Sequence, residues 1–393
     1  MKSDYDVLGN HIRLIDTRNT DSITDRVLGI NIDKFFMPSV ANVIGTDLSK
    51  YKLITKGKFA CNPMHVGRDE RLPVALYEED EPAIVSPAYF MFEIIDGSVL
   101  DENYLMMWFR RPEFDRICWL HTDGSVRGGI TWDDICRLEL PVPPIDEQRE
   151  IVRSYKAITE RIALKKQIND NLAEQCACIL YNQYSADSEN GKPWAKYTVQ
   201  NLIDKGFIDP PMDGNHGEIH PKVSDYVASG VPFVMANNIA DGFVDLSQCA
   251  FITEKQAKSL RKGFAKPNDV LLTHKATLGR VAIVPEGYNY IILTPQVTYY
   301  RVHKGLSNVY LRYYFASSYF QSILESFAGG GSTRAYIGIT KQCELPIYLP
   351  CESSMLAVTN ALEQIERVRA LNQAEIQHLN EVRNTLVSQL SSR

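Results

Sequence analysis

The chain has 393 residues, of which 45% are hydrophobic, and this length suffices for two or three separate cores, so we expect a globular protein rather than a small disulfide-stabilised one. No apolar run approaches the ~18 residues that span a bilayer and the first ten residues lack the apolar stretch of a signal peptide, so a cytoplasmic protein without a membrane segment is expected. The formal net charge of −6 counts against holding nucleic acid by charge alone, but residues 191–350 carry +4 against −7 for residues 1–145, so a base-reading surface is not excluded.

Residues 1–145 are predicted to form a first globular domain. Towards its end, residues 101–120 have the apolar spacing of a helix, which Pro112 interrupts. The string ELP follows at 139–141 as a strand and leads into a proline-rich stretch.

Two stretches without glycine or proline, residues 146–190 and 351–393, are predicted to be long helices, because apolar residues recur in both at every third or fourth position. The prolines before each stretch hold the incoming chain extended, so Asp146 or Ser353 is expected to cap the first helical turn. Each helix has one apolar stripe, and we expect the two to pair as an antiparallel coiled coil. The alternative is that each helix wraps on its own globular domain.

Residues 191–350 are predicted to form a second globular domain. β-branched and aromatic residues alternate between turn signals, which predicts strands at 232–239, 268–274, 279–284 and 296–302. A helix over 307–327 is expected to follow these strands.

The two globular domains are predicted to be copies of one plan. GSVRGGI (124–130) recurs as GSTRAYI (331–337), and ELP recurs at 344–346. Further residues recur at an offset of 206: Tyr104 and Tyr310, Leu105 and Leu311, Phe109 and Phe315, Phe114 and Phe320, Ile117 and Ile323. The sequence therefore predicts an α+β fold in the order domain, helix, domain, helix, and we interpret each heptapeptide as a structural turn of a duplicated domain.

The sequence offers little chemistry for catalysis. The eight cysteines form no CxxC pair and lack the spacing of a zinc site, so buried, reduced thiols are expected. The stretch HGEIH (216–220) contains glycine and precedes a proline, which predicts histidines in a loop rather than metal ligands on a helix. DPPM (209–212) resembles the D-P-P-aromatic element of adenine-N6 methyltransferases but lacks the aromatic residue, and no cofactor loop or P-loop occurs. We expect no catalytic residue, metal or cofactor in this chain.

Side chains that suit base edges and phosphates are concentrated in a few loops. Arg and Lys bind guanine edges or phosphates and Asn binds adenine, so such loops are candidates for DNA contact. The corresponding loops of the two domains offer Asn62, His65 and Arg68 in the first and His274, Lys275, Thr277 and Arg280 in the second. Other loops of the second domain and the two heptapeptides add Asn215, His216, His220, Lys222, Asn237, Asn238, Arg127 and Arg334. For the two heptapeptide arginines, support of the fold is the alternative to contact with the DNA backbone.

Over essentially its whole length the sequence resembles a specificity (S) subunit of a type I restriction-modification system. The resemblance rests on the tandem order of domains and helices and on three strings: ELPVPPIDEQREIV (139–152), GVPFVMANNIADGFVD (230–245) and KPNDVLLTHKATLGRVAIV (266–284). SKYKLITKGKFACNPMHVGRD (49–69) and GSVRGGITWDDICRLELPVP (124–143) resemble a recurrent type of first recognition domain. The second helix begins with LPCESSM, which lacks the Glu-Gln of PPIDEQ, so the two helix starts are not expected to dock partners equivalently.

This resemblance implies two target-recognition domains, at 1–145 and 191–350, which each read half of a bipartite double-stranded DNA sequence. The helices at 146–190 and 351–393 would act as a spacer and dock two methyltransferase (M) subunits, which bind S-adenosylmethionine and modify adenine, and restriction (R) subunits could join for ATP-driven cleavage. The S subunit itself would be noncatalytic. Two alternatives stay open: a stand-alone adenine-N6 DNA methyltransferase, suggested only by DPPM, and a coiled-coil protein-interaction scaffold.

Overall fold

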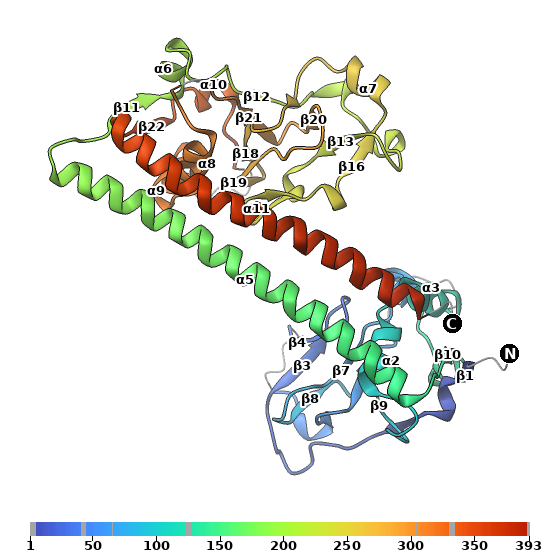
Figure 1. Ribbon diagram of the computed structural model, residues 1–393. Coiled ribbons are helices and arrows are strands. Elements are labelled where there is room, and N and C mark those ends of the chain that lie inside the picture. Colours follow the sequence, from blue (N-terminus) through green and yellow to red (C-terminus); the bar gives the residue numbers. More distant parts are fainter. Residues whose placement is uncertain are drawn as a thin grey trace. The chain divides into compact units, whose positions relative to one another are not determined.

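The computed structural model describes residues 5–40, 45–64, 66–122, 128–303, 305–329 and 335–390. The chain divides into two compact units: unit 1 is Met1–Leu164 with Glu375–Arg393, and unit 2 is Lys165–Ala374. Both units mix helices and strands (Figure 1), so the predicted α+β class is confirmed. Among the described residues, no helix is both long and apolar enough to cross a membrane.

The described strands of each unit include two four-stranded sheets. In spatial order, the sheets of unit 1 are β2 (Ile12–Ile15), β9 (Phe90–Ile94), β6 (Phe59–Cys61) and β7 (Val74–Leu76), and β4 (Phe36–Pro38), β3 (Val27–Ile30), β8 (Ala83–Val85) and β5 (Lys52–Ile54). Those of unit 2 are β12 (Met212–Asp213), β21 (Val297–Tyr300), β18 (Val270–Lys275) and β19 (Thr277–Ile283), and β16 (Ala250–Ile252), β13 (Val231–Val234), β20 (Ile291–Leu293) and β17 (Phe264–Ala265).

The two units repeat one topology. In each, the first sheet is antiparallel, and the second contains a parallel pair, β3 with β8 in unit 1 and β13 with β20 in unit 2. A two-stranded pair also recurs, β1 (Tyr5–Val7) with β10 (Glu139–Pro141) and β11 (Ala195–Thr198) with β22 (Pro346–Leu349). The repeat in the sequence therefore corresponds to a repeat of strand order, sheet by sheet.

The predicted strands of the second half overlap β18, β19 and β21, but the strand predicted over 232–239 is too long. β13 ends at Val234, and a single 3-10 turn follows at Ala236–Asn238. The turn forms because the Asn238 side chain accepts a hydrogen bond from the Met235 amide at 2.9 Å, a local bond that competes with strand pairing.

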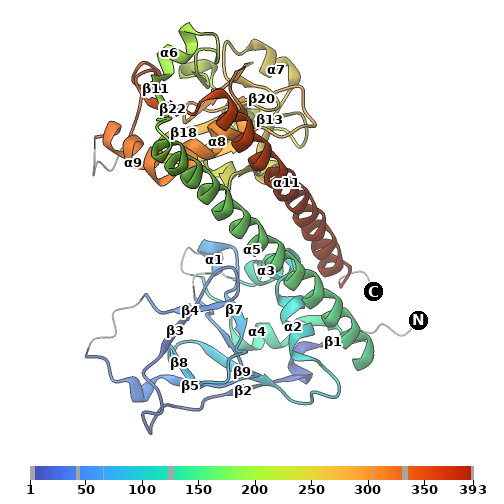
Figure 2. The same cartoon turned by 60° about the vertical axis from the view of Figure 1, so that its left-hand side comes forward.

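Short helices follow the sheets in each unit: α2 (Glu102–Phe109), α3 (Pro112–Leu120) and α4 (Trp132–Cys136), and α8 (Asn308–Ala316), α9 (Ser318–Phe327) and α10 (Ile339–Gln342). In unit 1, α2 packs between β7 and the first half of the long helix α5 (Ile145–Glu189), as Figure 2 shows. The prediction of one helix over 307–327 is wrong. Ser317 is extended (φ −65°, ψ 144°) and its hydroxyl accepts a hydrogen bond from the Phe320 amide at 3.3 Å, so it ends α8 and caps α9.

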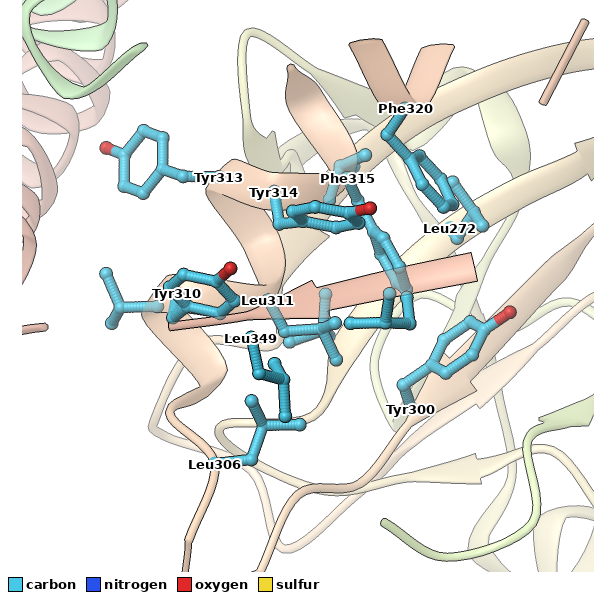
Figure 3. Packing of buried hydrophobic residues seen from close by; sticks show 14 of the residues in the cluster. Leu272, Tyr300, Leu306, Tyr310, Leu311, Tyr313, Tyr314, Phe315, Phe320 and Leu349 are labelled. Carbon is cyan, nitrogen blue, oxygen red and sulfur yellow. The ribbon is translucent and has the colours of Figure 1, made fainter. Parts of the chain in front are cut away.

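The cores explain why certain aromatic residues recur. Phe315 and Phe320 are fully buried and their ring centroids are 4.5 Å apart (Figure 3). The corresponding Phe109 and Phe114 of unit 1 are also buried, with centroids 4.9 Å apart. In both units this aromatic pair joins the short helices to the first sheet, so the repeated residues have a structural purpose.

The second long helix, α11, spans Glu352–Gln389. The capping residues predicted for the two long helices are wrong, because α5 begins at Ile145 and α11 begins at Glu352, so Asp146 and Ser353 lie inside the first turns. Pro144 lacks an amide hydrogen, which costs nothing at a helix start, and its carbonyl accepts from the Gln148 amide at 3.1 Å.

Both long helices contribute to each unit, and side chains connect them there. In unit 1, Arg161 Nε of α5 donates to Glu375 of α11 at 2.6 Å. In unit 2, the Ser354 hydroxyl of α11 donates to Asp187 of α5 at 2.9 Å. The contact in unit 1 therefore joins the first half of α5 to the second half of α11, and the contact in unit 2 joins the second half of α5 to the first half of α11.

All eight cysteines are free, but the expectation that they are buried is confirmed for only four of them: Cys136 and Cys343 are half-buried, and Cys178 and Cys351 are exposed. Cys178 lies on the outer face of α5, and Cys351 immediately precedes α11. Hydrogen bonding with the hydroxyls of Ser353 and then Ser354 lowers the pKa of Cys351 to about 7.

Candidate nucleic-acid interface

The turn that joins β18 to β19 presents two of the predicted DNA-contacting residues, Lys275 and Thr277. Between them, Ala276 adopts a left-handed conformation (φ 65°), so the turn is tight. Lys275 is exposed, and its ammonium lies 5.8 Å from the ring centroid of Tyr336, which is 50% exposed. A cation beside an exposed aromatic ring can contact a phosphate and the face of a base.

His274, in the same turn region, is fully buried and lies behind this surface. Its Nδ1 donates to the Ile337 carbonyl at 2.9 Å, which ties β18 to the chain segment that carries Tyr336. Burial lowers the pKa of His274, so the ring is neutral at pH 7. The predicted residue His274 is placed to support the turn.

A second group of predicted residues follows β12. His216 is half-exposed, and its Nε2 lies 3.0 Å from the buried carboxylate of Asp213, which also binds Lys262. Burial raises the pKa of Asp213, but hydrogen bonds from Lys262 and His216 outweigh burial and hold that pKa below its usual value. The carboxylate therefore stays ionised and orients the Lys262 ammonium and the His216 ring.

The remaining predicted residues of this loop differ in role. Asn215 is buried, and its side chain donates to the Lys262 carbonyl at 2.6 Å and accepts from the Arg261 amide at 3.0 Å. His220 donates through Nδ1 to the Asn215 carbonyl at 3.2 Å, while Lys222 is exposed. Lys222 is thus available to a ligand, whereas Asn215 and His220 hold the loop.

The turn after β13 separates the two predicted asparagines. Asn237 is exposed, whereas Asn238 is buried and donates to the Gln248 carbonyl at 3.1 Å. Arg280 of β19 donates to the carbonyls of Ala236 and Ile239 at 3.2 and 3.0 Å. Asn238 and Arg280 therefore fix the turn, and Asn237 faces solvent from it.

In unit 1, the predicted residue Asn62 directly follows strand β6, and Arg68 lies within the short helix α1 (Val66–Asp69). Asn62 accepts from the Met64 amide at 3.1 Å, and exposed Arg68 binds its neighbour Asp69 with two hydrogen bonds of 2.6 and 2.8 Å. Because Asp69 neutralises it, Arg68 presents less positive charge than the sequence suggested.

Three predicted residues, His65, Arg127 and Arg334, lie outside the described residues, as does most of each heptapeptide. The final isoleucines of both heptapeptides, Ile130 and Ile337, are described and buried at equivalent places in the two cores.

Sequence reasoning missed Tyr336 and Lys262. Tyr336 stands inside the repeated heptapeptide, where an aromatic residue shortly after a run of glycines in the sequence was the available signal. Lys262 is one of two adjacent basic residues, Arg261 and Lys262, and only the folded chain places it on Asp213.

DPPM does not form a site of its own. Asp209 accepts a hydrogen bond from His303 Nε2 at 2.7 Å, and Met212 starts strand β12. Among the residues that the structure describes, no group of three or more His, Cys, Asp or Glu side chains could hold a metal ion.

Comparison with known proteins identifies the fold. No protein-family model matches the chain, and no curated protein is significantly similar to it. Among solved structures, the S subunit of a type I restriction-modification system from M. genitalium has a TM-score of 0.55 at 12% identity, over 98% of this chain and 95% of that one. The chain is also similar to one from a structure concerning complex assembly and conformational transition of the type I R-M system, with 17% identity and a TM-score of 0.41 over 98% of this chain and 96% of that one. A third similar structure is the HsdS subunit from Thermoanaerobacter tengcongensis, with 16% identity and a TM-score of 0.40 over 98% of this chain and 95% of that one. The chain therefore has the fold of a type I S subunit along nearly its whole length.

Proposed function

We propose that this chain is the sequence-specific DNA-recognition subunit of a type I restriction-modification complex, in which each globular domain reads half of a bipartite target. The observation that carries the proposal is the repeated strand order of units 1 and 2, because it gives a single chain two copies of one potential reading surface. The likeness in fold to the M. genitalium S subunit over nearly the full length supports the same function.

The reading surface proposed for the second domain lies around the turn between β18 and β19. Lys275 would contact a phosphate, Tyr336 the face of a base or a sugar, and His216 a base edge or a phosphate. Asn237 adds an exposed amide that suits adenine. Residues 191–350 carry a net charge of +4, which favours contact with the DNA backbone.

The two long helices are proposed to pair as an antiparallel coiled coil that spaces the two half-sites. The bonds of Arg161 with Glu375 and of Ser354 with Asp187 support this pairing, because their residue numbers run in opposite directions along α5 and α11. α5 has 45 residues, and at a rise of ~1.5 Å per residue it is roughly 68 Å long, which exceeds the ~34 Å of one DNA turn.

The same helices are proposed to dock two M subunits. Leu356, Val368 and Leu371 of α11 are 63%, 47% and 71% exposed, and Tyr181 of α5 is 70% exposed. Side chains of this kind on helices leave apolar surface for further helices to cover. In the proposed complex the M subunits bind S-adenosylmethionine and methylate adenine in each half-site, and R subunits join them for cleavage.

The proposal gives this chain no catalytic step. The Asp209 carboxylate of DPPM is occupied by His303, and no aromatic side chain stands at position 212, so the element lacks the ring that would stack on an extruded base. This favours a noncatalytic subunit over a stand-alone adenine-N6 methyltransferase.

The test is to co-express the chain with its neighbouring methyltransferase and to sequence the methylome. We expect adenine methylation within a split motif, and a complex that methylates without any sequence preference would contradict the proposal. Isothermal titration of the isolated chain with S-adenosylmethionine addresses the stand-alone methyltransferase, since the proposal requires that no heat of binding is seen. If the complex showed no salt-sensitive affinity for any duplex, the scaffold function would be favoured instead.

A further inference from the structure

Arginines from three different elements bind the backbone of one short segment of unit 2, residues 236–242. This segment contains the 3-10 turn with Asn237, strand β14 (Ile239–Ala240) and the turn into strand β15 (Phe243–Val244). Arg280 of β19 donates to the carbonyls at its start. At its end, Arg312 of α8 donates to the Gly242 carbonyl at 3.3 Å and Arg369 of α11 donates to the Asp241 carbonyl at 2.9 Å.

Arg369 makes more contacts than the other two, although it belongs to the C-terminal long helix. It is 2% exposed, and its guanidinium lies 4.8 Å from the ring centroid of Phe243 in β15. It also donates to Glu366 at 3.0 Å and to the hydroxyl of Tyr313 at 3.1 Å, and through Nε to the Asn169 carbonyl of α5 at 3.2 Å. Tyr313 points away from the aromatic core of unit 2 (Figure 3), towards this polar cluster.

The turn that Arg369 contacts joins two paired strands, β14 and β15, in which Ile239 lies opposite Val244 and Ala240 opposite Phe243. Asp241 and Gly242 both adopt left-handed conformations, with φ of 53° and 84°, and Asp-Gly is a residue pair that two-residue hairpin turns prefer at such angles. A cavity of about 420 Å³ borders the turn and is lined by residues that include Asp241, Gly242, Arg312 and Arg369. With open space on one side of the turn, the strand pairing and the hydrogen bonds from Arg312 and Arg369 hold its position.

The arginines are not arranged as a phosphate site. Glu366 lies 3.0 Å from Arg369 and 3.5 Å from Arg312, and the exposed acids Asp170 and Glu174 of α5 also line the cavity. Their negative charges offset the guanidinium groups and would repel an anion. The donors are directed at backbone carbonyls, which fixes the path of the segment.

We infer that Arg369 is a positioning residue for base readout by residues 236–242. The segment presents exposed Asn237 at one end and is held at the other end by Arg369, so a side chain of the C-terminal helix controls specificity in the second recognition domain. The inference rests on the proposed function, since readout requires that this domain contacts DNA. It goes further, because it places a determinant of one half-site outside residues 191–350, on the long helix that follows them.

The test is the methylome of the complete complex carrying Arg369→Met, compared with Arg367→Met, an exposed arginine on the same helix, as the matched control. Arg369→Met should relax one half of the motif, so that methylation of single-mismatch sites in that half rises by about 10-fold, while the other half is unchanged. Arg367→Met should leave both halves unchanged. If Arg369→Met lowers methylation at every site but leaves both halves of the motif intact, the residue is only structural and the inference is wrong.

Gly242→Ala perturbs the same turn from its own backbone and keeps the inference falsifiable if Arg369→Met prevents assembly. An added Cβ at Gly242 would displace the guanidinium of Arg312 and lie 3.4 Å from that of Arg369, and an alanine is strained at the φ of 84°. The same half of the motif should relax, and an unchanged motif in an assembled Gly242→Ala complex would overturn the inference. A wild-type complex without a split motif would instead reject the proposed function, so the two failures are distinguishable.

Discussion

Two adjacent asparagines, Asn237 and Asn238, should respond in opposite ways to the same substitution. Asn238 is 2% exposed, accepts from the Met235 amide at 2.9 Å and donates to the Gln248 carbonyl at 3.1 Å. Asn237 is exposed, and the described contacts include no hydrogen bond from its side chain. Asn238 therefore stabilises the turn, whereas Asn237 can contribute only to binding.

The magnitude follows from the two hydrogen bonds of Asn238. Each contributes about 1 kcal/mol to the free energy of unfolding, so Asn238→Ala should cost about 2 kcal/mol. For a unit of this size, about 1 kcal/mol shifts the thermal midpoint by roughly 2–4 °C, which gives a fall of about 4–8 °C. Asn237→Ala should change the free energy of unfolding by less than about 0.5 kcal/mol.

Thermal unfolding of the purified subunit measures the first effect, and the methylome of the complex measures the second. Asn237→Ala should keep the thermal midpoint and weaken discrimination at one base pair by about 10-fold. The reasoning is refuted if Asn237→Ala lowers the midpoint as much as Asn238→Ala does, or if Asn238→Ala leaves the midpoint unchanged.

Three further predictions use the same complex. Arg68→Ala and Arg280→Ala should each affect a different half of the methylated motif, and an effect of both on one half would contradict two separate reading domains. Burial lowers the pKa of His274 below its usual 6.5, so the unfolded chain takes up the proton first as the pH falls. The contribution of the neutral ring to the free energy of unfolding is therefore complete above about pH 6.5 and declines below it. The thermal midpoint should fall between pH 7 and 5 more in the wild type than in His274→Gln, and equal falls would show that His274 does not titrate this way. Cys351, with its pKa lowered to about 7, should be alkylated by iodoacetamide at pH 7 before Cys178, and mass spectrometry that finds Cys178 modified first would contradict the hydroxyl contacts at the start of α11.

The predicted features that the structure bears out depend on neighbours in the chain. The α+β class, the division of helix 101–120 at Pro112 and the strands around 270–300 follow from periodicity and from proline. The errors also have local causes that the pattern hides. Ser317 has an ordinary propensity for a helix, yet its hydroxyl caps the start of α9 and its extended backbone ends α8. The structure therefore has two helices where the sequence predicted one.

The candidate reading surface was less predictable, because residue type does not fix exposure. By residue type, both members of the pairs Asn237 and Asn238, and His274 and Lys275, were predicted to contact DNA. In each pair only one side chain is exposed, Asn237 in the first and Lys275 in the second. Tyr336, which lies beside Lys275, was missed because no spacing in the sequence connects the two positions.

The sequence by itself determined the duplicated plan and the class of elements in it, because periodicity, proline and glycine act over a few residues and the repeat is visible by comparison of the two halves. The tertiary structure decided which polar side chains remain free to meet a ligand. Residues 236–242 are held by Arg280, Arg312 and Arg369, which lie up to 128 residues along the chain from the carbonyls that they bind, and such long-range contacts arise only when the chain folds. For this reason a residue of the last helix, with no sequence feature to mark it, is the one that we assign to the reading of DNA by a domain that precedes it.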